Sequence, residues 1–195
     1  MRFATLHSLR SAAIIAMTLP QENQGQKRNP RAQTEGVGVE IMLRTFAPAD
    51  FETLWEIDQA CYEPEVAYSR RELKNYMSFS GADCVVAEAH QPNATARSKV
   101  VGFCITARRG EWGYIITMDV LADWRRHGVG TLLLEEAEQR MASRGVREVS
   151  LETATDNQAA IAFWKRHGYR NRGVRKGYYP GGRDAFGMVK PLPPK

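Results

Sequence analysis

The residues with the clearest chemical potential form a basic turn with two glycines, Arg125-Arg126-His127-Gly128-Val129-Gly130. Glycine adopts positive φ and lets a ligand approach the backbone. The first N–H groups of a helix lack internal partners, and the helix dipole makes them favourable for an anion. The turn has neither the Gly-Lys-Ser/Thr of a Walker loop nor the third glycine of a dinucleotide fingerprint. Alone it therefore indicates either a phosphate site or an ordinary turn.

Three residues downstream add chemistry to this turn. Glu152 lies at the end of a predicted strand, Asn157 at the start of the next predicted helix, and Trp164 further along that helix. Taken singly, each has a structural explanation, because strand-end carboxylates are often solvated, asparagine often caps a helix and tryptophan often packs in a core. Their order after the glycine turn favours one shared site.

Composition limits the class of protein. The 195 residues are 43% hydrophobic and 25% charged, as expected for one globular domain with its own core. The net charge of +5 favours acidic partners such as a nucleotide-like cofactor, an acidic peptide or RNA. The aromatic and basic residues nevertheless form no RNA-recognition pattern. No stretch approaches the roughly 18 apolar residues of a membrane span.

The three cysteines, Cys61, Cys84 and Cys104, are scattered and lack metal-ligand spacing. They are typical of buried, reduced thiols in a cytosolic protein, so we expect a cytoplasmic location and no metal.

The ends of the chain differ from its middle. Residues 1–40 combine a short apolar stretch with a polar segment rich in Gln, Asn and Gly. We expect a disordered tail or a start codon assigned too early, since Met42 opens the first clear strand, rather than a targeting segment. Residues 41–190 form the predicted domain, and the proline-rich residues 191–195 a second tail.

The elements that must position the turn follow from hydrophobic periodicity. Helices are predicted from Pro48 and from Ser69, where Ser69 and Glu72 match a capping box, and over 131–144, ended by Gly145, and 157–167. The pattern indicates one mixed α/β sheet with helices on both faces. Strands are predicted over residues 41–46, 83–89, 99–107, 112–121, 146–152, 169–174 and 185–189.

The run from Val120 to Tyr169 resembles the GNAT superfamily of N-acetyltransferases. The acyl-CoA signature of that superfamily, Arg/Gln-x-x-Gly-x-Gly/Ala, stands here as residues 125–130. The strings Leu151-Glu152, Asn157-Gln-Ala-Ala160 and Tyr178-Tyr179-Pro180 are similar to the RimI-type ribosomal-protein-alanine N-acetyltransferases. The resemblance covers about residues 42–190. It implies a mixed, mostly antiparallel sheet with helices on both faces and a splayed parallel pair at the acyl-CoA site.

The resemblance also implies a division of roles around acetyl-CoA. Its pyrophosphate would bind the backbone N–H groups of the turn, and its pantetheine arm would run along the preceding strand. Glu152 matches the base that takes a proton from the acceptor amine. The cofactor-binding residues so implied are Met118, Asp119, Val120, Arg125, Arg126, His127, Gly128, Val129, Gly130, Thr131 and Asn157.

Trp164 departs from the subgroup, which usually has a tyrosine there that protonates the departing CoA thiolate. An indole N–H donates a hydrogen bond but does not release its proton. Either Trp164 only packs against the cofactor, or the general acid lies elsewhere. Tyr178, Tyr179 and water are the alternatives.

The resemblance predicts acetyl transfer to the N-terminal α-amine of a protein, in particular a ribosomal protein, with Tyr178 and Tyr179 holding the peptide. One alternative is a small amine such as a polyamine or aminoglycoside, which Glu63 and Glu65 would attract. Another is a weakly active module that binds acyl-CoA, which Trp164 favours.

Overall fold

The computed structural model describes residues 39–90 and 98–193, so residues 1–38 of the predicted N-terminal tail and residues 91–97 lie outside the described residues. Helices α1 (Phe51–Cys61), α2 (Arg70–Met77), α3 (Val129–Ser143) and α4 (Gln158–Arg166) accompany seven strands. The strands are β1 (Glu40–Thr45), β2 (Ala82–His90), β3 (Lys99–Arg109), β4 (Trp112–Val120), β5 (Glu148–Ala154), β6 (Arg170–Tyr179) and β7 (Arg183–Pro191).

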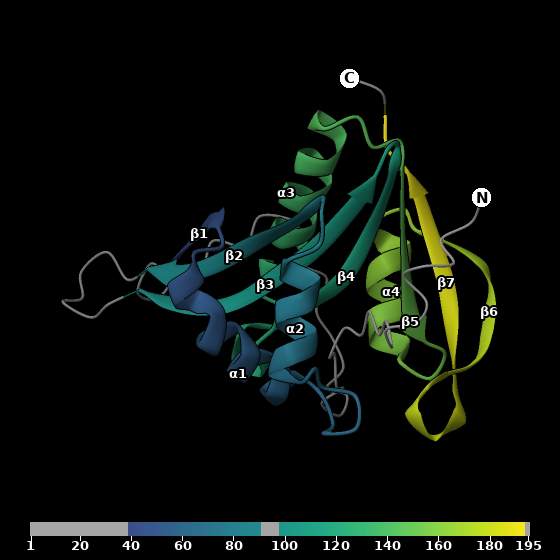
Figure 1. Cartoon of the computed structure of the whole chain (residues 1–195), viewed down its shortest axis with the longest axis horizontal. Helices are drawn as coiled ribbons and strands as arrows, with labels where there is room; N and C mark the ends of the chain where they lie inside the picture. Colours follow the sequence, from purple (N-terminus) through teal and green to yellow (C-terminus); the bar gives the residue numbers. More distant parts are fainter. Residues whose placement is uncertain (1–38, 91–97, 194–195) are drawn as a thin grey trace, which may run out of the picture.

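The seven strands form one sheet in the order β1-β2-β3-β4-β5-β7-β6 (Figure 1). Only β4 and β5 run parallel, and every other neighbouring pair is antiparallel. The predicted fold class, including the splayed parallel pair, is confirmed.

The helices cover both faces of the sheet because side chains alternate along each strand. On β2, Val85 and Ala87 join the core beneath α3 and α4. Their neighbours Cys84 and Val86 join the core beneath α1 and α2. The glycine turn therefore begins the helix on one face of the sheet, and the segment between α1 and α2 continues from the helices on the other face.

Several element boundaries differ from prediction. β5 continues to Ala154, so Glu152 lies within the strand. Tyr178 and Tyr179, predicted in a loop, are the last residues of β6. The strand predicted over residues 169–174 is present, but its extension to Tyr179 was missed because β6 is an edge strand whose residues 170–177 are exposed, which leaves no apolar alternation. β7 reaches Pro191, and the next residue, Leu192, is buried.

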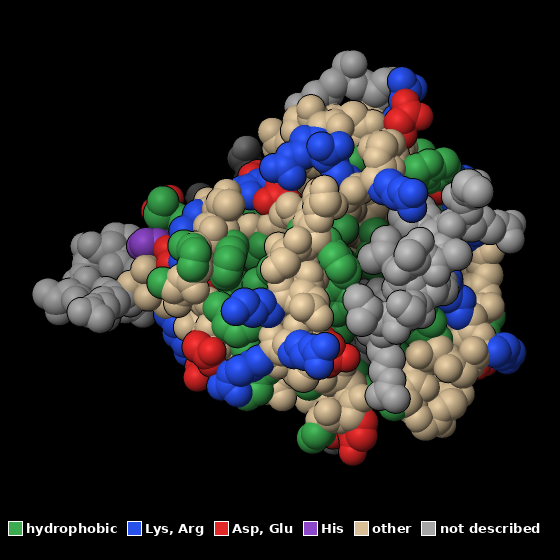
Figure 2. Space-filling model, viewed as in Figure 1, with side chains coloured by type: hydrophobic (Ala, Val, Ile, Leu, Met, Phe, Trp, Pro, Cys, Tyr) green, Lys and Arg blue, Asp and Glu red, His purple; other side chains and the backbone are tan. Residues whose placement is uncertain are grey.

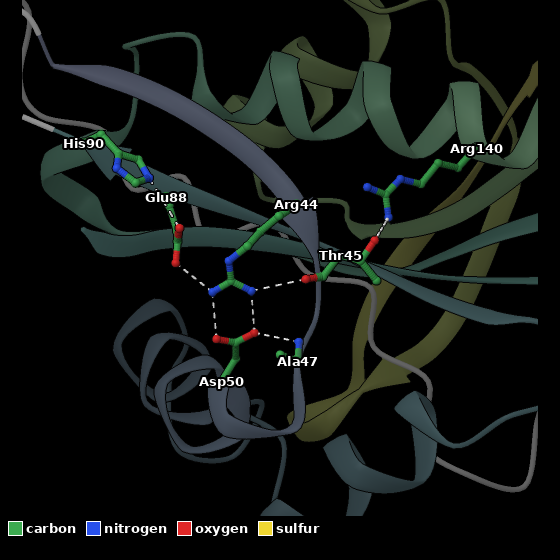
Figure 3. A network of polar contacts seen from close by, with 7 residues as sticks. All are labelled: Arg44, Thr45, Ala47, Asp50, Glu88, His90 and Arg140. Carbon is green, nitrogen blue, oxygen red and sulfur yellow. Dashed lines mark hydrogen bonds and ion pairs between the residues drawn. The ribbon is translucent and has the colours of Figure 1, made fainter. Parts of the chain in front are cut away.

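A charged network holds the start of α1 against the sheet (Figure 3). The Arg44 guanidinium on β1 donates to both carboxylate oxygens of Asp50, at 2.6 and 2.7 Å, and to Glu88 Oε1 at 2.7 Å. Asp50 also accepts from the Ala47 N–H at 2.7 Å. Hydrogen bonding from Arg44 lowers the pKa of Asp50 and of Glu88 below their ordinary values. This network fixes the orientation of the start of α1 relative to the sheet.

The positive net charge is not gathered into one patch on the face seen in Figure 1. Figure 2 shows Lys and Arg side chains spread over that face and interspersed with Asp and Glu. On this face, therefore, there is no single basic surface of the kind that tracks a nucleic acid backbone.

Candidate active site

The centre of the site is the opening between the two parallel strands. β4 pairs with β5 only at Trp112 with Glu148, Gly113 with Val149 and Tyr114 with Ser150. Beyond Tyr114 the strands diverge (Figure 1). The remaining residues of β4, 115–120, are buried. Buried backbone groups require hydrogen-bond partners, so this edge of β4 is suited to bind an extended ligand.

The glycine turn lies directly beyond that edge, at the start of α3. Gly128 is the N-cap residue with a φ of 84°, and Arg126 has a φ of 65°, a region that side chains other than glycine rarely adopt. These angles turn the chain sharply into α3, whose first N–H groups have no partner within the helix. The local geometry is that of an anion-binding helix start.

The predicted donors around the turn face different ways. Arg125 is turned inward, with Nε donating to the Val120 carbonyl at 2.8 Å and a terminal nitrogen 3.6 Å from Cys61 Sγ. His127 Nδ1 lies 2.8 Å from the Arg125 carbonyl oxygen. The Arg126 side chain is exposed. Arg125 thus stabilises the end of β4, and the turn offers mainly backbone N–H groups to an anion.

Two other residues of α3 that were predicted to bind the cofactor, Val129 and Thr131, have side chains engaged within the protein. Their predicted contacts with an anion are therefore through backbone N–H groups. The Val129 side chain is fully buried in the core. Thr131 Oγ1 lies 3.1 Å from Nε2 of His167, at the end of α4. This contact ties the start of α3 to α4.

Glu152 is a buried carboxylate with two partners. Arg175 Nε on β6 lies 2.8 Å from Glu152 Oε1, and the Tyr114 hydroxyl donates to Oε2. Gly187 on β7 stands opposite Glu152, and the space that its missing side chain leaves lies beside the Arg175 guanidinium. Sequence reasoning missed Tyr114 and Arg175. Strand alternation places Tyr114 beside the opening, but no local signal identifies Arg175.

The two other predicted residues downstream of the turn, Asn157 and Trp164, lie on α4. The Asn157 side chain caps the helix by accepting from the Ala160 N–H at 3.0 Å. The Trp164 ring is buried, and its centroid lies 5.2 Å from that of Phe163 and 5.1 Å from that of Tyr169. Within residues 39–90 and 98–193, the indole Nε1 has no hydrogen-bond partner.

The opposite side of the opening is aromatic. Tyr179 forms a small buried cluster with Ala154 and Ala185, and Tyr62 and Tyr178 pack against it. Burial raises the pKa of Tyr179 above its ordinary value. The segment between α1 and α2 that carries Tyr62 also exposes Glu63 and Glu65. This side therefore combines apolar surface with acidic groups, a suitable surface for an amine-bearing chain.

No cluster of three or more His, Cys, Asp or Glu side chains in the part of the chain that the structure describes is arranged to hold a metal ion. No helix among the described residues is both long and apolar enough to cross a membrane.

Comparison with known proteins identifies relatives of this site. The model of the Acetyltransferase (GNAT) family matches residues 51–169. An N-alpha-acetyltransferase of Saccharolobus solfataricus is 36% identical over 81 residues, 41% of this chain and 48% of that protein. The ribosomal protein bS18-alanine N-acetyltransferase of Salmonella typhimurium is 33% identical over 101 residues, 50% of this chain and 68% of that protein.

A solved structure shares the fold. The crystal structure of Arabidopsis thaliana NAA60 in complex with acetyl-CoA has a TM-score of 0.69 and 21% identity, covering 78% of this chain and 99% of that one. The matching segment spans about half the length of the Saccharolobus relative and about two thirds of the Salmonella relative.

Proposed function

Because the chain belongs to the acetyltransferase (GNAT) family, we propose that it transfers an acetyl group from acetyl-CoA to the N-terminal α-amine of a protein. One observation carries the proposal. The edge of β4 from Ile115 to Val120 is buried, is unpaired with β5, and leads directly into the anion-binding start of α3. A ligand with an extended amide arm and a phosphate end, as CoA has, matches that edge and that turn.

The cofactor would be held mostly by backbone. Pyrophosphate oxygens would accept from the N–H groups of Arg126 to Thr131, and the pantetheine amides would pair with Met118, Asp119 and Val120. Arg125 supports this edge by fixing the Val120 carbonyl. Asn157 would contact the cofactor from α4, where it already caps the helix. A backbone N–H near Val120 would polarise the thioester carbonyl as an oxyanion donor.

Glu152 would act as the general base. An amine attacks a thioester only when neutral, so its ammonium must first lose a proton. The Tyr114 hydroxyl already donates to Glu152. It can receive a proton from the acceptor while passing its own to the carboxylate. Arg175 holds the other carboxylate oxygen at 2.8 Å and so keeps Glu152 in place.

The acceptor would enter beside the aromatic cluster of Tyr62, Tyr178 and Tyr179. Tyr178 and Tyr179 would hold the peptide terminus, and Trp164 would pack against the cofactor side. The names of the Saccharolobus and Salmonella relatives support an N-terminal α-amine as acceptor, and the second supports a ribosomal protein. The three buried free thiols among the described residues support a cytoplasmic location for the protein.

Mass spectrometry after incubation with acetyl-CoA tests the acceptor. Peptides beginning with Ala, Ser or Met, and ribosomal proteins, are compared with the same peptides carrying a blocked N-terminus. We expect acetyl only on free α-amines.

Glu63 and Glu65 favour a second candidate acceptor, a small cationic amine. Acetyl transfer to a polyamine, without transfer to any peptide, would establish it. Tight binding of acetyl-CoA with no CoA release across all amines would instead identify a binding module.

A further inference from the structure

The buried end of β4 carries a carboxyl group that the roles above do not use. Asp119 is fully buried. Its Oδ1 accepts from the Tyr62 hydroxyl at 2.5 Å and from the Thr117 hydroxyl at 2.9 Å. Its Oδ2 has no hydrogen-bond partner anywhere in the described ranges. A buried oxygen without a partner is costly and calls for an explanation.

The hydrogen bonds show which oxygen of Asp119 would carry a proton. Both donors point at Oδ1, so this atom acts as an acceptor. In the neutral acid the hydrogen therefore sits on Oδ2, where no described residue receives it. Burial, reinforced by the nearby Asp58 carboxyl, raises the pKa of Asp119 well above its ordinary value.

The surroundings of Asp119 are mixed in charge. The Tyr62 hydroxyl and the Thr117 hydroxyl hydrogen-bond it directly. The titratable groups that act on it from neighbouring elements are Asp58 and Tyr62, from α1 and the segment after it, and Arg125 from the glycine turn. Asp119 acts in turn on the Cys61 thiol of α1. Desolvation remains the largest influence, ahead of the favourable Arg125 charge.

Tyr62 joins Asp119 to the acceptor side. Its hydroxyl is bound to β4, while its ring packs against the cluster of Ala154, Tyr179 and Ala185 at the ends of β5, β6 and β7. The side chain therefore crosses the opening between β4 and β5 on the α1 face. Its hydroxyl thus connects that face directly to the buried carboxyl.

We propose that Asp119 is the general acid that protonates the departing CoA thiolate, and that Tyr62 restores its proton from the acceptor. The inference rests on the proposed function, because it places the thioester beside residues 118–120. It assigns the acid role to a side chain on the strand along which pantetheine would run. Trp164, at the family's acid position, has no proton to give.

The proton balance closes. When the tetrahedral adduct collapses, the C–S bond breaks, its electron pair stays on sulfur, and the Asp119 Oδ2 proton passes to that sulfur. The acceptor ammonium loses two protons in forming the amide. One leaves through Tyr114 and Glu152 to solvent. The other reaches the Tyr62 oxygen as Tyr62 gives its own proton to Asp119 Oδ1. Rotation of the carboxyl group by half a turn then exchanges its two oxygens, so the proton again lies on the side without a donor and the acid is restored.

Asp119→Asn tests the acid, because asparagine keeps the size and the acceptor oxygen but has no transferable proton. With acetyl-CoA we expect kcat to fall about 100-fold, while the Kd for acetyl-CoA stays within about two-fold. The alkaline limb of the kcat profile, which reports the acid in the bound complex, should disappear. Asp83→Asn is the control, because it removes another mostly buried carboxylate that pairs with Arg140 and Arg144 away from the opening.

Two results overturn the assignment. One is an Asp119→Asn enzyme whose kcat stays within about two-fold of wild type. The other is a fall in kcat matched by an equal loss of acetyl-CoA affinity with an unchanged pH profile, which marks a structural role. If that variant fails to fold, Tyr62→Phe decides the question. It should lower kcat about ten-fold with unchanged binding, and an unchanged kcat rejects the relay and the acid together.

The assay separates this inference from the proposed function. CoA release is followed with whichever amine the wild-type protein accepts. Transfer to small amines alone overturns the proposed acceptor, yet the Asp119→Asn comparison is then made with that amine. No release with any amine overturns both.

Discussion

The carboxylates that bind Arg44 and the carboxyl groups buried on α1 and β4 are held in opposite ways. Asp50 and Glu88 each bind the Arg44 guanidinium, which lowers their pKa values. Asp58 and Asp119 are fully buried, and burial raises their pKa values, that of Asp58 to about 7. The first pair contributes stability as anions. The second pair makes the site less stable when ionised and keeps protons available.

Glu152 stands between these two cases. It has an arginine partner, as Asp50 does, but lies buried beside the opening, as Asp119 does. Pairing with arginine therefore does not by itself mark a carboxylate as structural. In the proposed mechanism the difference is instead whether a proton route reaches the carboxylate, which the Tyr114 hydroxyl would provide for Glu152.

Glu152→Gln has the largest expected effect on kcat and tests the position of Glu152 between the two cases. The amide keeps the shape but accepts no proton, so kcat should fall about 10²- to 10⁴-fold, measured by CoA release at saturating acetyl-CoA. Glu148→Gln is the matched control, because Glu148 is on the same strand and also pairs with an arginine, Arg172, at 2.8 Å. Equal losses in the two variants would show that the ion pairs of β5 are merely structural.

Asp58→Asn tests the buried pair through stability. A carboxyl with a raised folded-state pKa contributes stability below its unfolded pKa and loses it as pH rises through the folded value, here about 7. As pH rises from about 4 to about 8, the unfolding free energy of the variant should therefore increase by about 2 to 4 kcal/mol relative to that of wild type. Urea denaturation at each pH measures this. A constant difference between variant and wild type at every pH would contradict it.

Arg44→Ala tests the charged network that Arg44 forms with Asp50 and Glu88. It leaves Asp50 and Glu88 without their shared cation, so the unfolding free energy should fall by about 2 kcal/mol near neutral pH. Because both folded-state pKa values are lowered, that loss should shrink as pH falls below about 4, where the carboxylates gain protons. Arg147→Ala, which removes an exposed pair with Glu111, should cost under about 0.5 kcal/mol. If the two variants lose the same unfolding free energy, the Arg44 network contributes no more stability than an exposed ion pair.

Trp164→Tyr has the smallest expected effect on rate. If Asp119 supplies the proton, a tyrosine at the family's acid position adds little, so kcat should stay within about three-fold of wild type or rise. The smaller ring leaves space in the core, and a modest loss of stability should accompany it. A rise of about 100-fold would show that the wild-type chain lacks a working acid.

Local signals in the sequence were sufficient for much of the fold. Ser69 and Glu72 form the predicted capping box of α2, and Gly145, just after α3, has the predicted positive φ of 83°. Asn157 caps α4 as its position indicates. Each of these depends on residues within a few positions of one another, so spacing alone predicts them.

The contacts that define the site were not predictable in the same way. Tyr114 and Glu152 are 38 positions apart, and Tyr62 and Asp119 are 57 apart. They meet only because β4 and β5 separate after three paired positions and because α1 enters at the angle that Arg44 fixes. Arg125 gives a further example, since its Nε donates to the Val120 carbonyl, a contact that its place in the signature does not reveal.

The exposed strand β6 has a consequence for how copies of this chain meet one another. As an edge of the sheet, it presents backbone groups that another strand could extend into a continuous, aggregating sheet. Its exposed residues include Arg170, Arg172, Arg175 and Lys176. Two such edges brought together would set these basic side chains against one another, which disfavours pairing between copies of β6.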